Sequence, residues 1–343
     1  MQLNRRMRGF TLVELMIAMG LGLMLLAGLS VVFLNSSRSR EEMERSNRQI
    51  ENGRYAMHVL TEDLRLAGYL AEFDIQQTAL ATSAPALKPD ACATAVADLI
   101  AALPMHIQGY DLGAGAPGCI GDVRAGTDIL VVRRAGSCIN GAPRCDMPAG
   151  GPFFQASLCN NAAELGHVDP ANYYRLTTDL TLLDRHMRDC AATASQRRYL
   201  VRIYFIANND VAGDGIPTLK RAELVGARFT VSPIAQGIEN LQLEYGIDTS
   251  GDGAPDTFSA DPDALNACAG AICNRNWTNT MAVKVAILAR NTLATQNYVD
   301  DKSYVVGLKS DGTDNVIAAA GDGYKRHVYQ AEVRINNAAG RRE

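Results

Sequence analysis

The sequence lacks a marked excess of charge of either sign, and it lacks the short motifs of several enzyme classes. Its 33 lysines and arginines against 37 acidic residues give a formal net charge of −4. This balance provides no basic surface, so no nucleic-acid partner is expected. No G-x-S-x-G, H-E-x-x-H or phosphate-binding loop motif occurs. We therefore expect no catalytic residues, and a signal-anchored periplasmic enzyme stays open only as an alternative.

Cysteine is absent from the first 91 residues, and all eight cysteines follow. An even number in what would be an exported segment indicates disulfides formed in an oxidising compartment. A zinc site would need closer pairs, such as C-x-x-C, with supporting histidines. His186 and Cys190 are four residues apart and could be a base and a nucleophile, but a disulfide cysteine beside a surface histidine is favoured. We expect sequence neighbours to pair: Cys92 with Cys119, Cys138 with Cys145, Cys159 with Cys190, and Cys268 with Cys273.

Charge is nearly absent from residues 10–34, where Glu14 is the one ionisable side chain. At about 1.5 Å per residue a helix of this length spans a bilayer of roughly 30 Å. Arg5, Arg6 and Arg8 precede the segment and predict that the N-terminus stays in the cytoplasm. The chain should therefore cross the bacterial inner membrane once, with its C-terminus in the periplasm. An ordinary secretory signal ending near Ala27 and Gly28 is a weaker alternative.

Glu14 requires a partner, because an unpaired carboxylate inside a membrane is costly. The residues around it read Arg8-Gly9-Phe10-Thr11-Leu12-Val13-Glu14, and this stretch resembles the leader of type IV prepilins. The resemblance implies that a prepilin peptidase cuts between Gly9 and Phe10 and methylates the new amine of Phe10. It also implies that Glu14 pairs with the terminal amine of a neighbouring subunit during assembly. An uncleaved signal anchor is the plainer alternative.

Residues 35–69 should continue the helix into the periplasm as an amphipathic segment. They contain no proline, and Met43, Ile50, Met57 and Leu64 recur at heptad spacing, with Leu60 and Ala67 on the same side. Gly53 weakens this helix, and Gly68 is placed to end it. The expected organisation is a leader at 1–9, a transmembrane assembly helix at 10–34, a periplasmic helix at 35–69 and a periplasmic domain at 70–343.

The remaining residues predict an α+β fold, in which the long helix packs on a mainly antiparallel β domain with disulfide-bearing loops. Alternation of apolar and polar residues predicts two half-buried strands, at residues 241–247 and 329–335. Residues rich in β-branched and aromatic side chains predict further strands at 127–134, 198–207, 222–231 and 281–290. Residues 79–126 and 136–172 are rich in alanine or in turn formers, and we expect both to be surface insertions.

Oxygen-bearing side chains alternate in the loop from Asp248 to Asp256. Asp248, Ser250, Asp252 and Asp256 resemble the first half of a calcium-binding loop. A full EF-hand loop would need an acid where Ser259 stands, and Asp-Gly is also a common hairpin turn. A plain turn is therefore favoured over calcium, and no other cofactor is expected. Residues 210–215 show the same pattern with fewer possible ligands, and a turn is expected there too.

Several stretches extend the resemblance to the PilW type of minor pilins: 52–56 (Asn-Gly-Arg-Tyr-Ala), 63–69, 215–221, 237–248 and 324–329. That type usually closes on an Arg-Asn pair, where this chain has Asn336-Asn337. The resemblance implies a minor pilin that primes pilus assembly and lies near the fibre tip. Its expected partners are the prepilin peptidase, the assembly platform of the inner membrane, other minor pilins, the major pilin and a tip adhesin. A pseudopilin of a type II secretion system remains the main alternative.

Overall fold

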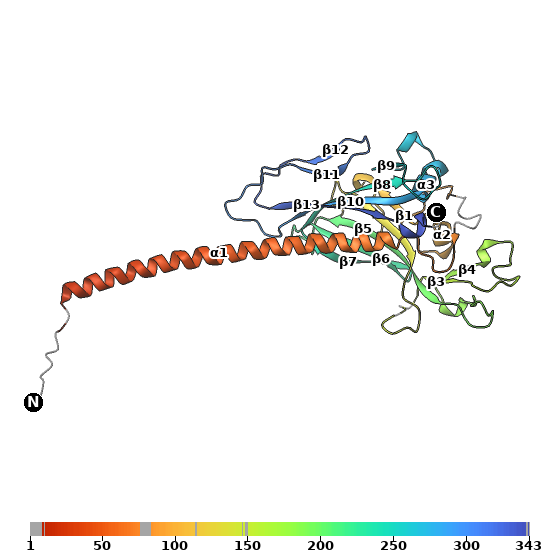
Figure 1. Cartoon of the computed structure of the whole chain (residues 1–343), viewed down its shortest axis with the longest axis horizontal. Helices are drawn as coiled ribbons and strands as arrows, with labels where there is room; N and C mark the ends of the chain where they lie inside the picture. The colour runs from red at the N-terminus through yellow and green to blue at the C-terminus, as the bar shows by residue number, and fades with distance from the viewer. Residues whose placement is uncertain are drawn as a thin grey trace, which may run out of the picture. The chain divides into compact units, whose positions relative to one another are not determined.

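The computed structural model describes residues 9, 11–75, 84–113, 115–145, 147, 150–340 and 342. The chain has an α+β fold, with a long N-terminal helix followed by antiparallel sheets (Figure 1). It divides into two units, residues 1–48 and residues 49–343. The first unit contains the N-terminal part of the helix. The second contains the end of the helix and all the strands.

Helix α1 runs from Leu12 to Arg65, which is 54 residues. No proline interrupts it, in agreement with the expected continuation beyond residue 34. It ends just before Gly68, whose φ of 70° lies in the left-handed region that glycine adopts without strain. The N–H of Gly68 donates to the Arg133 carbonyl at 3.0 Å, so the chain leaves the helix already attached to a strand.

The other helices are short, and thirteen strands occur in the described residues. The helices are α2 Val96–Ala101, α3 Ala271–Thr278 and α4 Asn336–Ala339. The strands are β1 Ile107–Tyr110, β2 Ile129–Ala135, β3 Phe153–Ala156, β4 Tyr174–Thr177, β5 Gln196–Ala207, β6 Thr218–Val225, β7 Arg228–Gln236, β8 Ile238–Ile247, β9 Thr257–Ser259, β10 Thr280–Arg290, β11 Tyr304–Leu308, β12 Asp314–Ile317 and β13 Arg326–Arg334.

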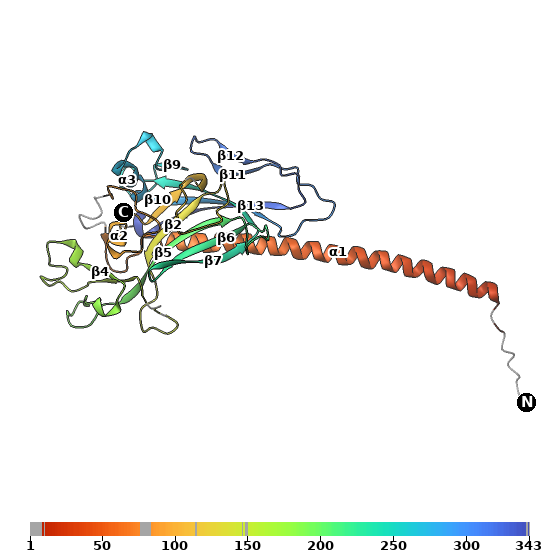
Figure 2. The same ribbon diagram turned by 180° about the vertical axis from the view of Figure 1, so that it is seen from behind.

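These strands form three antiparallel sheets. A seven-stranded sheet has the order β1-β2-β5-β3-β4, with β6 added to β5 and β7 added to β6. A four-stranded sheet has the order β13-β10-β8-β9, and β11 and β12 form a separate hairpin. Figure 2 shows β5, β6 and β7 together, seen from behind. Because each strand presents alternate side chains to opposite faces, the two large sheets can share one apolar core.

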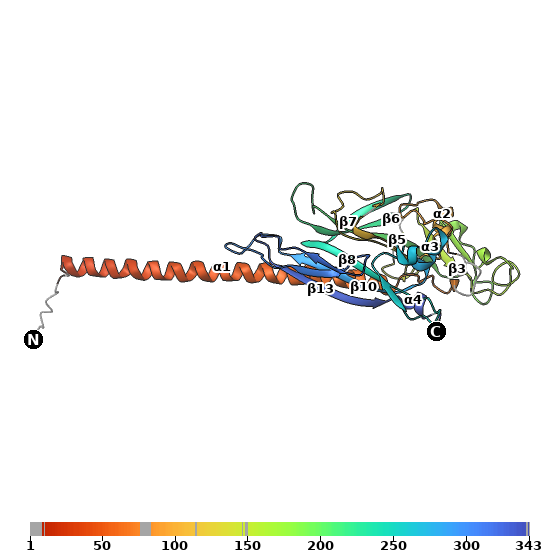
Figure 3. The ribbon, with the colours of Figure 1, turned by 90° about the horizontal axis from the view of Figure 1, so that it is seen from above.

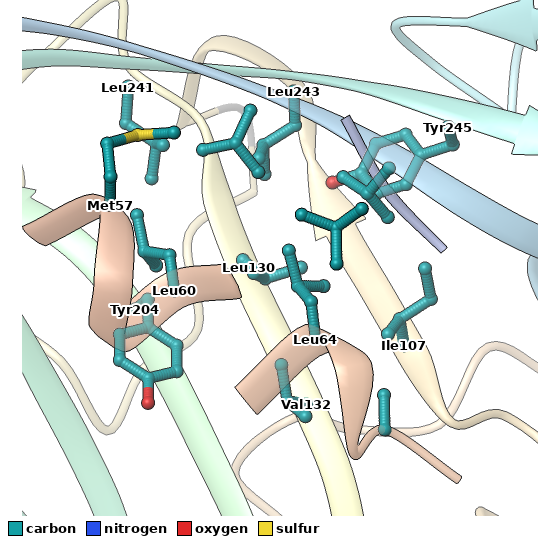
Figure 4. Packing of buried hydrophobic residues seen from close by; sticks show 14 of the residues in the cluster. Met57, Leu60, Leu64, Ile107, Leu130, Val132, Tyr204, Leu241, Leu243 and Tyr245 are labelled. Carbon is teal, nitrogen blue, oxygen red and sulfur yellow. The ribbon is translucent and has the colours of Figure 1, made fainter. Parts of the chain in front are cut away.

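The C-terminal end of α1 packs into that core between the two sheets (Figure 3). Met57, Leu60 and Leu64 contribute from the helix. In Figure 4 they lie among Leu130, Val132 and Tyr204 of the seven-stranded sheet and Leu241, Leu243 and Tyr245 of the four-stranded sheet. Full burial of a leucine stabilises by roughly 1.5 to 3 kcal/mol, so the last turns of α1 belong to the folding unit of the β domain.

The buried stripe of α1 differs in part from the predicted one. Met57 and Leu64 are buried as expected, but Met43 and Ile50 are 58% and 39% exposed. The buried stripe begins instead at Gln49, one residue before Ile50, and continues at Gly53. A straight helix turns every 3.6 residues, so a strict heptad drifts around it by about 20° per repeat. Extending the heptad backwards from Leu64 therefore selected the wrong residues.

One predicted strand was also wrong in its extent. Residues 222–231 form no single strand, because β6 ends at Val225 and β7 starts at Arg228. Gly226, with a φ of 62°, makes the tight turn between them. Strand β13 shows the expected alternation. Strand β8 is buried on both faces, because the β11–β12 hairpin covers the face expected to be exposed.

The two segments expected as surface insertions contribute to the core. Residues 79–126 contain α2 and β1, and Leu99 and Leu103 are 2% and 3% exposed. Residues 136–172 contain β3, which is buried along its whole length. Together with Phe73 and Phe154, these residues form a second apolar cluster on the other face of the seven-stranded sheet. Glycine and alanine content indicated loops, but tertiary packing decided burial.

Candidate assembly interface

Glu14 lies in the first turn of α1, where it closes a capping box with Thr11. The backbone N–H and the hydroxyl of Thr11 donate to Glu14 Oε2 at 3.0 and 2.9 Å. In return, the Glu14 N–H donates to Thr11 Oγ1 at 3.2 Å. This exchange satisfies backbone donors that the start of a helix otherwise leaves unpaired. The Thr-x-x-Glu pattern could have revealed this second role of Glu14, which the sequence reasoning missed.

The processing residues are described only in part. Gly9 is exposed, and a Cβ added there would meet no atom within 4 Å. Phe10 and residues 1–8 lie outside the described residues. The cut after Gly9 and the methylation of Phe10 therefore stay predictions.

The first half of α1 is apolar on all sides. Its side chains from Leu12 to Leu34 are exposed on every face, with Leu12, Leu26 and Phe33 each more than 60% exposed. The helix is long and apolar enough to cross a membrane by length and composition. A helix that is hydrophobic all round must be covered by lipid or by other helices. This segment can therefore anchor the chain in a membrane and pack against similar helices.

Where α1 enters the β domain, it contacts the four-stranded sheet directly. The Gln49 side chain, 8% exposed, donates to the carbonyls of Ala289 and Lys325 at 2.8 and 3.0 Å. One turn later, the Tyr329 ring lies against Gly53 so closely that any Cβ there would overlap it. Gly53 therefore allows close approach of helix and sheet, which offsets its low helix propensity.

Asp63 joins the end of α1 to the seven-stranded sheet through a buried ionic network. Its carboxylate, 3% exposed, accepts from Arg134 Nε at 2.7 Å, Arg202 Nη1 at 2.9 Å and the Tyr204 hydroxyl at 2.9 Å. Arg202 Nε also donates to Glu223 at 2.7 Å. Burial alone would lower the pKa of Arg202, but the carboxylates of Asp63 and Glu223 outweigh burial and raise that pKa. The guanidinium therefore stays charged, as the network requires.

A second buried network centres on Arg326, at the start of β13. Its guanidinium, 3% exposed, donates to Glu239 of β8 at 2.6 Å and to Asp300 and Asp322 at 2.8 and 2.7 Å. The hydrogen bonds from Arg326 are the main cause that lowers the pKa of Asp322 to about 2. This network fixes the long connection between β10 and β13 to the edge of the sheet.

Two family models match the chain. Residues 203–337 match the family described as type IV pilus-assembly protein W, and residues 4–30 match the prokaryotic N-terminal methylation motif. Together these matches support a type IV pilus minor pilin of the PilW type. Among solved structures, a type IV-like pilin from Thermus thermophilus is 13% identical, with 62% of this chain and 79% of that chain covered and a TM-score of 0.29. No curated protein sequence matches.

In this PilW-type pilin, four of the five stretches that carried the resemblance lie in contact with one another. Residues 52–56 contact residues 324–329 through Gly53 and Tyr329. Residues 237–248 contact the same stretch through Glu239 and Arg326. Arg290 connects residues 215–221 to it, because its guanidinium donates to the Gly215 carbonyl at 2.8 Å and stacks 4.0 Å from the Tyr324 ring. Of these contacts, the one between Gly53 and Tyr329 holds the helix to the four-stranded sheet.

The unusual Asn336-Asn337 pair lies beside the C-terminal end of α1. The Asn337 side chain donates to the carbonyl of Ala67 at 3.3 Å and to that of Arg65 at 3.5 Å. Carbonyls at the end of a helix have no partner within the helix, so this side chain provides one. Asn337 therefore ties α4, which follows the last strand, to the end of α1.

The eight cysteines form the four neighbouring pairs expected from the sequence: Cys92–Cys119, Cys138–Cys145, Cys159–Cys190 and Cys268–Cys273. Cys190 is therefore no free nucleophile. His186 Nδ1 instead contacts Glu164 at 2.8 Å, and Ser157 donates to the same carboxylate at 2.5 Å. The carboxylate lies between the serine and the histidine, so this is not the order of a hydrolytic triad. The cluster holds the Cys159–Cys190 loop in place.

The Asp248–Asp256 loop uses its oxygen atoms within the chain. Asp248 accepts from the N–H groups of Gly251 and Gly253, and Arg342 donates to its Oδ2 at 3.0 Å. Asp256 Oδ2 accepts from the N–H of Thr249 at 2.7 Å. In the described residues, no group of three or more acidic, histidine or cysteine side chains is placed to hold a metal ion. Ser250 and Asp252 also bond within the loop, which is the arrangement of a turn.

Proposed function

We propose that this PilW-type pilin is anchored in the bacterial inner membrane by residues 10–34, with its C-terminal domain in the periplasm. Prepilin peptidase cuts after Gly9, and the mature chain assembles into the fibre through the inner-membrane assembly platform. The observation that carries this proposal is the division of α1. Its N-terminal part, up to Leu34, is apolar and exposed on all faces, whereas its last part, from Gln49 onward, is built into the β domain. One continuous helix therefore connects the assembly segment to the domain that it carries.

Within the pilus, we propose that this subunit primes assembly and lies at or near the tip, with other minor pilins and a tip adhesin. It would then contact the major pilin beneath it and contribute to cell adhesion and twitching motility. Membership in the PilW type supports this placement. The role is structural and not catalytic, which fits the oxidised Cys190 and the engaged Glu164.

Glu14 has two separable uses, and two substitutions distinguish them. Glu14→Gln keeps an oxygen that can accept from Thr11 but removes the charge, whereas Glu14→Ala removes both. If assembly needs the carboxylate to pair with a neighbour's terminal amine, both variants should be processed normally and both should be missing from sheared fibres. Mass spectrometry of the N-terminus and immunoblots of fibres measure the two steps. Normal incorporation of Glu14→Gln would refute the pairing and leave capping as the role.

Tip placement is tested by labelling. An epitope inserted at Gly312, in the exposed turn of the β11–β12 hairpin, leaves both networks of α1 and β13 intact. Immunogold particles should then gather at fibre ends, at one site per fibre. An even distribution along the fibre would contradict tip placement without affecting the family assignment. A major pilin carrying the same epitope is the matched control.

A further inference from the structure

A cavity of about 290 Å³ opens on the outer face of the four-stranded sheet, beside the β11–β12 hairpin. Its floor is Ala286 of β10, and Gly307 of β11 borders it. Polar side chains from all three neighbouring strands line it: Gln242, Glu244, Lys284, Gln330 and Glu332. The opposite face of the same strands carries Leu241, Leu243 and Val285, which belong to the core. The cavity is therefore separate from the assembly helix and its junction.

The register of the sheet arranges these side chains in two rows. Lys284 pairs with Glu244 on one side and with Glu332 on the other, which gives a row of carboxylate, ammonium and carboxylate. Ala286 pairs with Gln242 and Gln330, which gives a row of carboxamide, methyl and carboxamide. Side chains directly opposite in neighbouring strands lie about 5 Å apart. The small Ala286 side chain between two glutamines therefore leaves the hollow.

The polar groups of the cavity have unused hydrogen-bonding capacity. Gln242 is 2% exposed, and its amide nitrogen donates to Gly126 and Asn240 at 3.0 and 2.8 Å, whereas its Oε1 has no donor among the described residues. Glu244 is 7% exposed, and its one charged neighbour in the described chain is Lys284, at 3.6 Å. Buried carboxylates and amides are normally fully hydrogen-bonded. These two acceptors are therefore available to a ligand.

The charges of the cavity select the class of ligand. An anion would meet Glu244 and Glu332, and a cation would meet Lys284, whose ammonium is fixed 4.0 Å from the centre of the Phe258 ring. A neutral molecule with many hydroxyl groups meets neither problem, because hydroxyls both donate and accept. The Ala286 methyl provides an apolar floor for C–H groups. We propose that this cavity binds one pyranose ring of a saccharide, and this goes beyond the assembly role.

Gly307 keeps the cavity open. Its φ is 68°, and a Cβ added there would lie 3.1 Å from the Gln242 Cβ and 3.7 Å from Glu244 Oε1. A side chain at this position would therefore be strained, and its Cβ would crowd the Gln242 Cβ and contact Glu244. The hairpin approaches the sheet at Gly307 without filling the cavity.

Saturation-transfer NMR on the full chain, in a detergent without a sugar headgroup, tests the proposal. N-acetylglucosamine represents cell-wall glycans, and galactose and mannose represent host-surface glycans. We expect transfer to the ring protons of at least one of these sugars. Gln330→Ala and Glu332→Ala, at exposed positions of β13, should each weaken binding about tenfold, which corresponds to one lost hydrogen bond of about 1.4 kcal/mol. Ala286→Leu should abolish binding by filling the hollow.

Thr230→Ala, at an exposed position of β7 in the other sheet, is the matched control and should bind sugar normally. Fluorescence of Trp277, the one tryptophan, reports whether each variant is folded. Absence of transfer from all three sugars would overturn the proposal. So would transfer that Gln330→Ala and Glu332→Ala leave unchanged. Arginine binding that depends on Glu332, without sugar binding, would instead assign the cavity to a cationic peptide and refute the saccharide.

Discussion

The Asp63 network makes a sharp prediction, because it holds the end of α1 to the seven-stranded sheet with almost no access to water. Asp63→Ala leaves the Arg134 and Arg202 guanidinium groups, whose side chains are 9% and 17% exposed, facing an apolar side chain. Removing one partner of a buried ion pair costs about 3 to 5 kcal/mol. The melting temperature of a domain this large should therefore fall by about 6 to 10 °C, at about 2 °C per kcal/mol.

Urea unfolding of the full chain in detergent, followed by Trp277 fluorescence, measures this change. Trp277 is 1% exposed and lies in the β domain, so its signal reports unfolding of that domain. Asp63→Asn keeps the shape and one acceptor oxygen but loses the charge, and its loss of stability should be intermediate. Glu62→Ala is the matched control, because Glu62 is exposed on the same helix and its one ion-pair partner among the described residues is exposed His58. It should change stability by less than about 0.5 kcal/mol.

If Asp63→Ala and Glu62→Ala lower the free energy of unfolding by the same amount, the Asp63 network does not hold the helix to the sheet, and the prediction is refuted. A large loss for Asp63→Ala with an unchanged slope of the urea transition would support the network. The slope scales with the surface exposed on unfolding. A reduced slope would show that the helix had already separated from the sheet in the folded state.

Three further predictions follow from buried contacts. Gly53→Ala should destabilise the domain by about 1 to 3 kcal/mol, because the added Cβ overlaps the Tyr329 ring. In urea unfolding, adding Tyr329→Ala to the same chain should recover part of the lost stability. Burial raises the pKa of Asp128 to about 8, so the folded state holds a proton that the unfolded state has lost. The free energy of unfolding should therefore fall as pH rises from about 6.5 to about 8. The pKa of buried His106 is lowered to about 4, so His106 contributes the opposite slope, but only below this pH range. Asp128→Asn should remove the fall in the free energy of unfolding. Millimolar calcium should leave the melting temperature unchanged, because Asp248 already accepts two backbone N–H groups and a guanidinium; an increase would restore the calcium alternative.

Much of the fold was predictable because its signals are local. The apolar run of residues 10–34 and the absence of proline through Gly68 predicted one long helix. Alternating or β-branched segments predicted β2, β5, β8, β10 and β13, with small errors at their ends. Two of the four disulfides, Cys138–Cys145 and Cys268–Cys273, close short loops with sequence separations of 7 and 5.

Other features depended on contacts between distant segments. The Thr-x-x-Glu pattern of the Thr11–Glu14 capping box is present in the sequence. It was overlooked because pairing with the amine of a neighbouring subunit was the only role assigned to the Glu14 carboxylate. The burial of β3 and α2 could not be predicted, since their alanine- and glycine-rich surroundings have the composition of loops. The three partners of Asp63 lie 71, 139 and 141 residues away along the chain, and no local pattern connects them.

The sequence by itself determined the membrane segment, the processing motif and the family, because each is carried by contiguous residues whose chemistry acts locally. Only the tertiary structure decided which face of α1 is buried, why Gly53 is a glycine, and that Glu239 and Arg326 form one network. It also placed Gln242 and Gln330 around Ala286. The physical reason is that sheet register and helix docking bring together side chains far apart in the chain, and burial then fixes which of them can remain charged or small.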